Sequence, residues 1–357
     1  MIRISQVTAR GLRRVLVCLS LCAGLTGALT VQADDGPDPA PAKPLTFEEN
    51  KSLADIGDAN AQHRLGLMYA TGQGAAQNDA EAAAWFRKAA DQSHAAAQFR
   101  LGGMYARGLG VTNDIEQALY WYRRSAQQNY PSAQFNLGYH HSIGLGVEQN
   151  FKEALKWYSR AALLGHPLAQ SNLGLAYATG RGVEKDYVEA ANWFRKAAEQ
   201  GLAHAQFNLA VMFADGLGLK QNHAEAAKLY HLAASQGYMM AQYNLGVMFR
   251  KGQGVPVNYA ETVKWYRLAA EQGDPQAQFN LGVMHSIGQG TAHDYVEGYK
   301  WYKLASAQGV EKAKRAAELI ATTMKPEELA EANKRADQFS VKRGDSVGDQ
   351  SGRAQDE

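Results

Sequence analysis

The sequence predicts an all-α protein, a solenoid of stacked helical hairpins, and three observations carry that prediction. A 36-residue unit recurs seven times without insertion or deletion, each unit holds two segments with helical spacing, and glycine turns separate those segments. The register is set by an Ala that is followed by Gln and, four positions after the Ala, by Leu. These Ala residues are Ala61, Ala97, Ala133, Ala169, Ala205, Ala241 and Ala277. A fixed period of this length is typical of solenoids, in which each unit packs only on its neighbours.

The first half of each unit follows the pattern A-Q-x-x-L-G-x-x-(Y/F)-x-x-G, which places small and apolar residues on one face of a helix. The Gly after the Leu recurs at Gly66, Gly102, Gly138, Gly174, Gly246 and Gly282, with Ala210 in the remaining copy. Glycine inside a helix costs about 1 kcal/mol relative to Ala. We therefore expect another backbone to approach closely at this column. The next glycine pair, such as Gly252 and Gly254, is predicted to end the helix and turn the chain.

The second half begins with a helix cap. One column holds Asn78, Asp114, Asn150, Asp186, Asn222, Asn258 and Asp294, and Glu or Gln follows three residues later. This spacing predicts a reciprocal capping box. The helix that follows reads A-x-x-W-(Y/F)-x-x-A-A. All six tryptophans lie in one of its columns, which predicts packing: Trp85, Trp121, Trp157, Trp193, Trp265 and Trp301.

The combined pattern, complete between Gly174 and Gly201, resembles the Sel-1-like repeat family, a relative of the tetratricopeptide repeat. The resemblance implies a right-handed α-solenoid, or superhelix, of stacked helix-turn-helix repeats that mediates protein–protein contacts. It also suggests roles in the bacterial envelope. Cysteine-rich members of the family are credited with β-lactam chemistry, but the repeats of this chain contain no Cys.

The repeats divide the chain into six regions. We expect a signal peptide at 1–33, a Pro-rich linker at 34–45, an N-terminal half-repeat at 46–60, seven repeats over 61–312, C-terminal capping helices at 313–339 and a disordered tail at 340–357. The repeats are expected at 61–96, 97–132, 133–168, 169–204, 205–240, 241–276 and 277–312.

The N-terminal segment has the features of an export signal. Four arginines precede an apolar run from Val15 to Val31, and cleavage is expected after Ala33; retention as an anchor is the alternative. Removal would take away both cysteines and change 37 basic and 35 acidic residues to 33 and 35. That balance, about −2, does not favour nucleic-acid binding. We expect a periplasmic or secreted protein with no membrane span after cleavage.

A stripe along the first helices is the candidate partner-binding surface. Positions three, seven and ten after the repeat Ala lie on one helical face. The predicted contact residues are Arg64, Arg100, Asn136, Asn172, Asn208, Asn244, Asn280, Met104, Met212, Met248 and Met284. Asn can bind a peptide backbone through its amide, and Met adapts to varied partners. The alternative is that Asn ties turns together and Met fills gaps between repeats. The arginines, with Arg107, suggest an anionic partner segment or, alternatively, a solvated face.

The sequence contains no motif for hydrolase chemistry and predicts no catalytic residue, cofactor or metal. His140, His141 and His285 are interpreted as residues at the edge of the core. The predicted function is therefore a non-enzymatic scaffold for a protein or peptide partner. A module that binds peptidoglycan or regulates cell-wall enzymes is the alternative, and a hydrolase is the least favoured reading.

Overall fold

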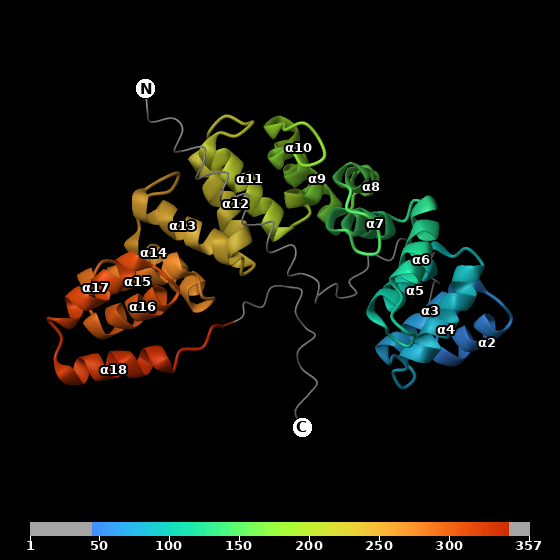
Figure 1. Cartoon of the computed structure of the whole chain (residues 1–357), viewed down its shortest axis with the longest axis horizontal. Coiled ribbons are helices and arrows are strands. Elements are labelled where there is room, and N and C mark those ends of the chain that lie inside the picture. Colours follow the sequence, from blue (N-terminus) through green and yellow to red (C-terminus); the bar gives the residue numbers. More distant parts are fainter. Residues whose placement is uncertain (1–44, 343–357) are drawn as a thin grey trace. The chain divides into compact units, whose positions relative to one another are not determined.

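The computed structural model describes residues 45–342, and the regular structure of this range consists of seventeen helices without a strand. The predicted signal peptide, nearly all of the predicted linker (34–44) and tail residues 343–357 lie outside the described residues. Consecutive helices pair as antiparallel hairpins joined by short turns (Figure 1). The predicted α-solenoid of helix-turn-helix repeats is confirmed.

The described chain forms two compact units, divided between Trp193 and Phe194 within α10 (Tyr187–Glu199). The N-terminal unit contains α2 (Phe47–Asp55), α3 (Ala59–Thr71), α4 (Asp79–Asp91), α5 (Ala95–Arg107), α6 (Ile115–Gln127), α7 (Pro131–Ile143), α8 (Phe151–Leu163) and α9 (Pro167–Thr179). The C-terminal unit contains α11 (Ala203–Asp215), α12 (His223–Ser235), α13 (Met239–Lys251), α14 (Tyr259–Glu271), α15 (Pro275–Ile287), α16 (Tyr295–Ala307), α17 (Glu311–Ala321) and α18 (Pro326–Asp337).

The Asn and Asp column caps all seven second helices, but the expected reciprocal capping box is wrong for these helices. Each cap side chain accepts a hydrogen bond from the backbone of the helix it starts, as Asn150 does from the Glu153 N–H at 3.0 Å. The backbone N–H of the cap residue instead donates to the first helix of the same repeat, as from Asn150 to the His141 carbonyl at 2.8 Å. Because that N–H already has an acceptor, it does not donate to the N3 Glu, and the Glu carboxylate remains available for other contacts.

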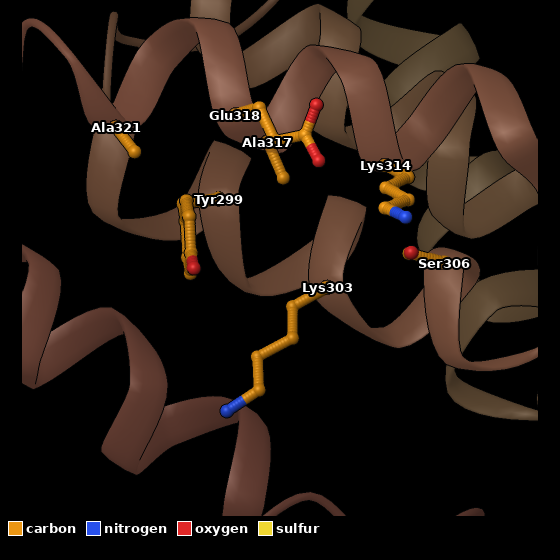
Figure 2. Close-up of a pocket in the computed structure, with 7 residues that line it drawn as sticks. All are labelled: Tyr299, Lys303, Ser306, Lys314, Ala317, Glu318 and Ala321. Carbon is orange, nitrogen blue, oxygen red and sulfur yellow. The ribbon is translucent and has the colours of Figure 1, made fainter.

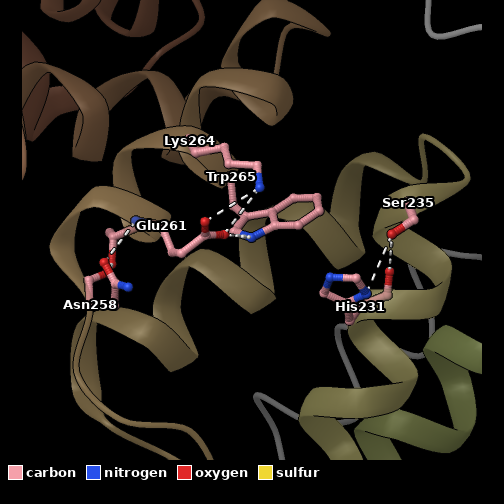
Figure 3. Close-up of polar contacts among 7 residues, drawn as sticks. His231, Ser235, Asn258, Glu261, Lys264 and Trp265 are labelled. Atoms are coloured by element: carbon pink, nitrogen blue, oxygen red, sulfur yellow. Dashed lines mark hydrogen bonds and ion pairs between the residues drawn. The ribbon is translucent and has the colours of Figure 1, made fainter.

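Figure 3 shows where this released carboxylate goes in one repeat. The Glu261 N–H donates to Asn258 Oδ1 at 3.1 Å, and the Glu261 carboxylate accepts from Lys264 Nζ and from Trp265 Nε1. The same Lys to Glu pairing three residues apart recurs at Lys156, Lys228 and Lys300. The N3 carboxylate therefore holds the second-helix surface, and in this repeat the Trp indole, in place.

An aromatic ring makes the closest approach to the glycine column of the first helices. A Cβ placed on Gly102 would lie 2.8 Å from the ring of Tyr122, and the same clash recurs with Phe86, Tyr158, Tyr266 and Tyr302 in the equivalent pairs. The expected backbone approach is also present, since that Cβ would lie 3.1 Å from the Ala118 carbonyl oxygen.

A closer backbone approach occurs at the second turn glycine of several repeats. A Cβ on Gly254, where φ is +72°, would overlap the backbone of His223 in the preceding repeat. Gly110, Gly182 and Gly290 meet the preceding backbone in the same way, whereas Gly146 meets the Ile115 side chain.

A ladder of buried glutamines, which the repeat pattern did not predict, joins the hairpins. In each copy the Gln after the repeat Ala donates to an Ala carbonyl eight residues earlier, at the end of the preceding second helix; Gln98 reaches the Ala90 carbonyl at 3.0 Å. Its Oε1 accepts from a Gln that ends the second helix of its own hairpin, as from Gln128 Nε2 at 2.8 Å. The equivalent donations come from Gln92, Gln236, Gln272 and Gln308. A side-chain amide with one donor and one acceptor committed locks three helix ends together.

The two ends of the described chain are closed by extra helices. Thr46 and Glu49 form a capping box that starts α2. At the other end, α18 folds back onto α16, where Lys303 Nζ donates to Asn333 Oδ1 and pairs with Asp337 Oδ1, both at 2.8 Å. The chain then continues to Lys342, whose N–H donates to the Glu271 carbonyl at 2.8 Å. These contacts hold the last helix against the repeats that precede it.

Candidate partner-binding surface

The predicted Asn column is largely buried. Asn136, Asn208 and Asn244 are at most 6% exposed, whereas Asn172 and Asn280 are half-buried. Two members contact tyrosine hydroxyls: Asn136 hydrogen-bonds Tyr122, and Asn280 Nδ2 lies 3.5 Å from Tyr243 Oη. A binding role for this column stays a prediction, and the half-buried members are the ones a partner reaches without rearrangement.

The predicted Met column lies in the core. Met104, Met212, Met248 and Met284 are 2–4% exposed. Met104 packs with Ala97, Leu101 and Trp121 in one apolar cluster, and Met284 packs with the equivalent residues of its own repeat. This burial fits the alternative in which Met fills the space between neighbouring hairpins.

The predicted arginines occupy different environments. Arg64 is half-buried and its Nε donates to Asn50 Oδ1 of α2 at 2.8 Å. Arg100 is half-buried within α5. Arg107 is exposed, and its Nε donates to the Gly103 carbonyl at 3.2 Å, one turn earlier in the same helix. Arg107 is therefore the arginine that is both accessible and held by its own helix.

The exposed face of the first helices is centred on positions six and ten after the repeat Ala. Position ten belongs to the predicted stripe, and position six lies beside it. Position six is apolar and half-buried in most copies: Leu67, Gly103, Tyr139, Leu175, Val211, Val247 and Val283, of which Val211 is buried. Position ten is exposed except at Thr179: Thr71, Arg107, Ile143, Thr179, Asp215, Lys251 and Ile287. The signal that would have found this face is the apolar column itself, which lies outside the packing columns. A surface of this kind binds apolar side chains, with specificity set by position ten.

The histidines lie at the core edge, as the sequence predicts. His140 and His285 are each 5% exposed. His140 Nδ1 donates to the Leu145 carbonyl at 2.8 Å, and Arg267 Nη2 donates to His285 Nε2 at 3.2 Å. Burial lowers the pKa of both imidazoles, and the nearby Arg123 and Arg267 guanidiniums act in the same direction. The burial of each ring therefore favours its neutral form.

The tryptophan column is a packing feature. Trp85, Trp121, Trp265 and Trp301 are 1–7% exposed, and Trp157 and Trp193 are half-buried against apolar clusters. These rings lie on the second helices, away from the first-helix face. They therefore do not form a stacking platform for sugar rings on that face.

A pocket in the C-terminal unit offers no evident chemistry. It is lined by residues of α16 and α17, shown in Figure 2: Tyr299, Lys303, Ser306, Lys314, Ala317, Glu318 and Ala321. Lys303 turns away toward α18, where its ammonium group is bound by Asn333 and Asp337. Among residues 45–342 no cluster of three His, Cys, Asp or Glu side chains is arranged to hold a metal ion. Within the same range no helix is long and apolar enough to cross a membrane.

Comparison with known proteins identifies the repeat. The family model of the Sel1 repeat matches seven segments, 59–94, 95–130, 131–166, 167–202, 203–238, 240–274 and 275–310. Most of these segments begin where a first helix begins, two residues before the repeat Ala. No curated protein matches the chain.

Two solved structures of repeat proteins are similar over most of the chain. A protective antigen of uropathogenic Escherichia coli is 33% identical, with a TM-score of 0.76, over 84% of this chain and 65% of that protein. The chain thus spans just under two thirds of that relative. A Sel1 repeat protein from Oxalobacter formigenes is 31% identical, with a TM-score of 0.62, over 77% of this chain and 79% of that protein.

Proposed function

The chain belongs to the Sel1 repeat family, whose solenoids are generally non-catalytic binding scaffolds, and we propose that it is an exported scaffold for a protein partner in the bacterial envelope. The observation that carries the proposal is the accessible first-helix face, which is apolar at position six and varied at position ten. Catalysis is not part of the proposal. Among residues 45–342 no group of three His, Cys, Asp or Glu side chains could hold a metal ion. Ser235 Oγ lies 3.4 Å from His231 Nδ1, but both residues are exposed on one turn of α12, and the hydroxyl donates to the His231 carbonyl at 2.8 Å.

The envelope location is supported by the N-terminal sequence. Arg3, Arg10, Arg13 and Arg14 precede the apolar run Val15–Val31, and Ala33 provides a small residue at the expected cleavage site. N-terminal sequencing of the protein isolated from the periplasmic fraction should begin at Asp34. Recovery of an intact Met1 terminus in the membrane fraction would instead establish a retained anchor.

The partner test is capture of the tagged protein from envelope extract, followed by mass spectrometry. The variants Asn172→Ala and Asn280→Ala test the predicted Asn column at its half-buried members, and Val247→Asp tests position six of the exposed face. We expect a specific protein that Val247→Asp loses. Peptidoglycan recovered without any protein would replace the proposal with the wall-binding alternative, which the burial of the tryptophans does not favour.

A further inference from the structure

Gly103 interrupts the apolar column of the exposed face. The other six copies carry Leu, Tyr or Val at this position, whereas α5 has no side chain here. A glycine in the middle of a helix costs about 1 kcal/mol relative to Ala. Gly103 therefore lowers the helix propensity of α5, and either packing or function has to account for this glycine.

Packing does not supply that reason. A Cβ on the adjacent Gly102 would lie 2.8 Å from the Tyr122 ring, so Gly102 is required by its neighbour. A Cβ on Gly103 would meet nothing closer than Tyr122 Oη at 3.7 Å and Arg107 Nη2 at 3.8 Å, which is ordinary contact. The fold would accept a side chain at Gly103, which is half-buried, so the face lacks at this position the side chain that the other copies carry.

Hydrogen-bond donors surround this position. We call it the Gly103 notch, formed by Gly103, Arg107, Tyr122 and Asn136. The Arg107 guanidinium is fixed beside it by the bond from Nε to the Gly103 carbonyl. The Asn136 amide donates to the Tyr122 hydroxyl, which leaves the hydroxyl proton for an acceptor. Burial raises the pKa of Tyr122 to about 12, so this hydroxyl stays protonated at neutral pH.

The surroundings of the notch restrict the ligand. Leu67 and Tyr139 occupy the same column in the preceding and following repeats, and both are half-buried, with apolar surface accessible. Arg107 is exposed and its helix carries no Asp or Glu. A cation and a neutral hydroxyl donor between apolar neighbours are complementary to a single carboxylate flanked by apolar side chains.

We propose that the Gly103 notch binds the carboxylate of an Asp or Glu side chain in an apolar segment of a protein partner. In this arrangement Arg107 supplies charge and Tyr122 supplies a directed hydrogen bond. The missing side chain at position 103 makes room for the incoming carboxylate. The proposal rests on the scaffold function and specifies the chemistry of its partner.

The test is selection of a phage-displayed library of random 12-residue peptides on the full-length protein. The enriched peptides should carry Asp or Glu between apolar residues. Synthetic copies are then measured by fluorescence anisotropy in acidic, amide (Glu→Gln or Asp→Asn) and phosphoserine forms. Three variants are compared with the wild type. Gly103→Val fills the notch with the residue found in three other copies, and Arg107→Gln removes the charge. Val188→Leu is the control, because it adds bulk to an exposed residue of a second helix, outside the first-helix face.

We expect Gly103→Val and Arg107→Gln each to weaken binding of the acidic peptide about tenfold or more, consistent with loss of one charged hydrogen bond. Val188→Leu should bind within twofold of wild type. The amide peptide should bind the wild type about tenfold more weakly, and Gly103→Val should add little further loss, because both changes remove the same contact. Circular dichroism melting establishes that each variant is folded, and Arg107→Gln tests an exposed residue should Gly103→Val unfold.

Four outcomes would each overturn the proposal: no enriched peptides, enrichment without acidic residues, wild-type affinity of the acidic peptide for both Gly103→Val and Arg107→Gln, or tighter binding of the phosphoserine form. The scaffold function is judged separately by envelope capture. A partner that is retained by Gly103→Val would leave the scaffold in place and reject the notch as its contact.

Discussion

Two successive hairpins of the N-terminal unit, α5–α6 and α7–α8, share one backbone plan and differ in how completely it is filled. In α5–α6, Gln128 donates to Gln98 Oε1 at 2.8 Å. In α7–α8, Leu164 occupies the position of Gln128, half of its surface is exposed, and Gln134 Oε1 is buried without a hydrogen-bond partner. A single side chain therefore decides whether the helix ends of a hairpin are locked.

The same two hairpins differ at the other columns. Trp121 of α6 is 3% exposed, whereas the equivalent Trp157 of α8 is half-buried. Met104 of α5 is replaced by His140 in α7. Repeats that share one sequence pattern are therefore expected to differ in stability. In a solenoid, where each unit depends on its neighbours, the weaker hairpin sets where unfolding starts.

The largest expected effect separates the two tryptophans. Trp121→Ala should lower the free energy of unfolding by about 3–5 kcal/mol, because a large buried ring leaves a cavity. Trp157→Ala should cost clearly less, since part of its ring is already in water. Urea denaturation followed by far-UV circular dichroism measures both. A Trp121 variant with a single sharp transition would argue against local coupling between repeats.

Exchanging Gln128 and Leu164 between the two hairpins should reverse the difference in their stability. Gln128→Leu leaves the Gln98 carbonyl oxygen buried and unpaired, which should cost about 1–3 kcal/mol. Leu164→Gln should supply the missing donor to Gln134 and stabilise by about 1 kcal/mol. Hydrogen exchange of the α7–α8 amides measures the second effect locally. Unchanged protection there would mean that Gln134 gains no partner from the substitution.

The adjacent glycines of α5 should respond in opposite directions. Gly102→Ala forces a methyl group against the buried Tyr122 ring, and we expect a net loss of about 1–2 kcal/mol, since overpacking outweighs the gain in helix propensity. Gly103→Ala should stabilise by about 1 kcal/mol, because its Cβ makes only ordinary contacts, with Tyr122 Oη at 3.7 Å and Arg107 Nη2 at 3.8 Å. Thermal melting of the two variants compares them directly. A loss of stability for Gly103→Ala would show that packing, rather than ligand binding, requires this glycine.

The smallest effect is the contribution of His140, in α7, to acid sensitivity. Burial lowers the pKa of His140 in the folded protein, and the charges of His141 and Arg123 lower it further. As the pH falls below about 6.5, the unfolded chain takes up a proton that the folded chain resists, so stability falls until the folded pKa is reached. His140→Met, the residue of α5 at this column, should reduce the stability difference between pH 7.5 and pH 5.5. Urea denaturation at both pH values checks this, with His293→Gln, at an exposed histidine, as control.

Much of the fold follows from residues that act locally. The cap column, the αL glycines and the seven Ala positions each specify a helix start, a helix end or a packing face within one repeat, and the structure places them accordingly. The predicted capping box is wrong because the atom that replaces it, a carbonyl oxygen of the preceding helix, lies outside the sequence of the cap and its first turn. The N-cap N–H is claimed by a carbonyl nine residues earlier, such as that of His141 for Asn150.

The candidate surface was less predictable for the same reason. Positions three and seven share a helical face with positions six and ten, and periodicity alone does not say which of them meets the next hairpin. Packing between hairpins buries Met104 and Asn136 and leaves Tyr139 and Arg107 accessible. Likewise, the repeated Gln was visible in the pattern, but its partner lies thirty residues away in the sequence.

The sequence by itself determined the repeat, its period, the helix boundaries and the scaffold class, because each rests on residues within one turn or on simple recurrence. The tertiary structure decided which columns are buried, which ring requires each glycine, and where a glycine has no such requirement. Those features depend on the distance between helices that the chain brings together only when it folds.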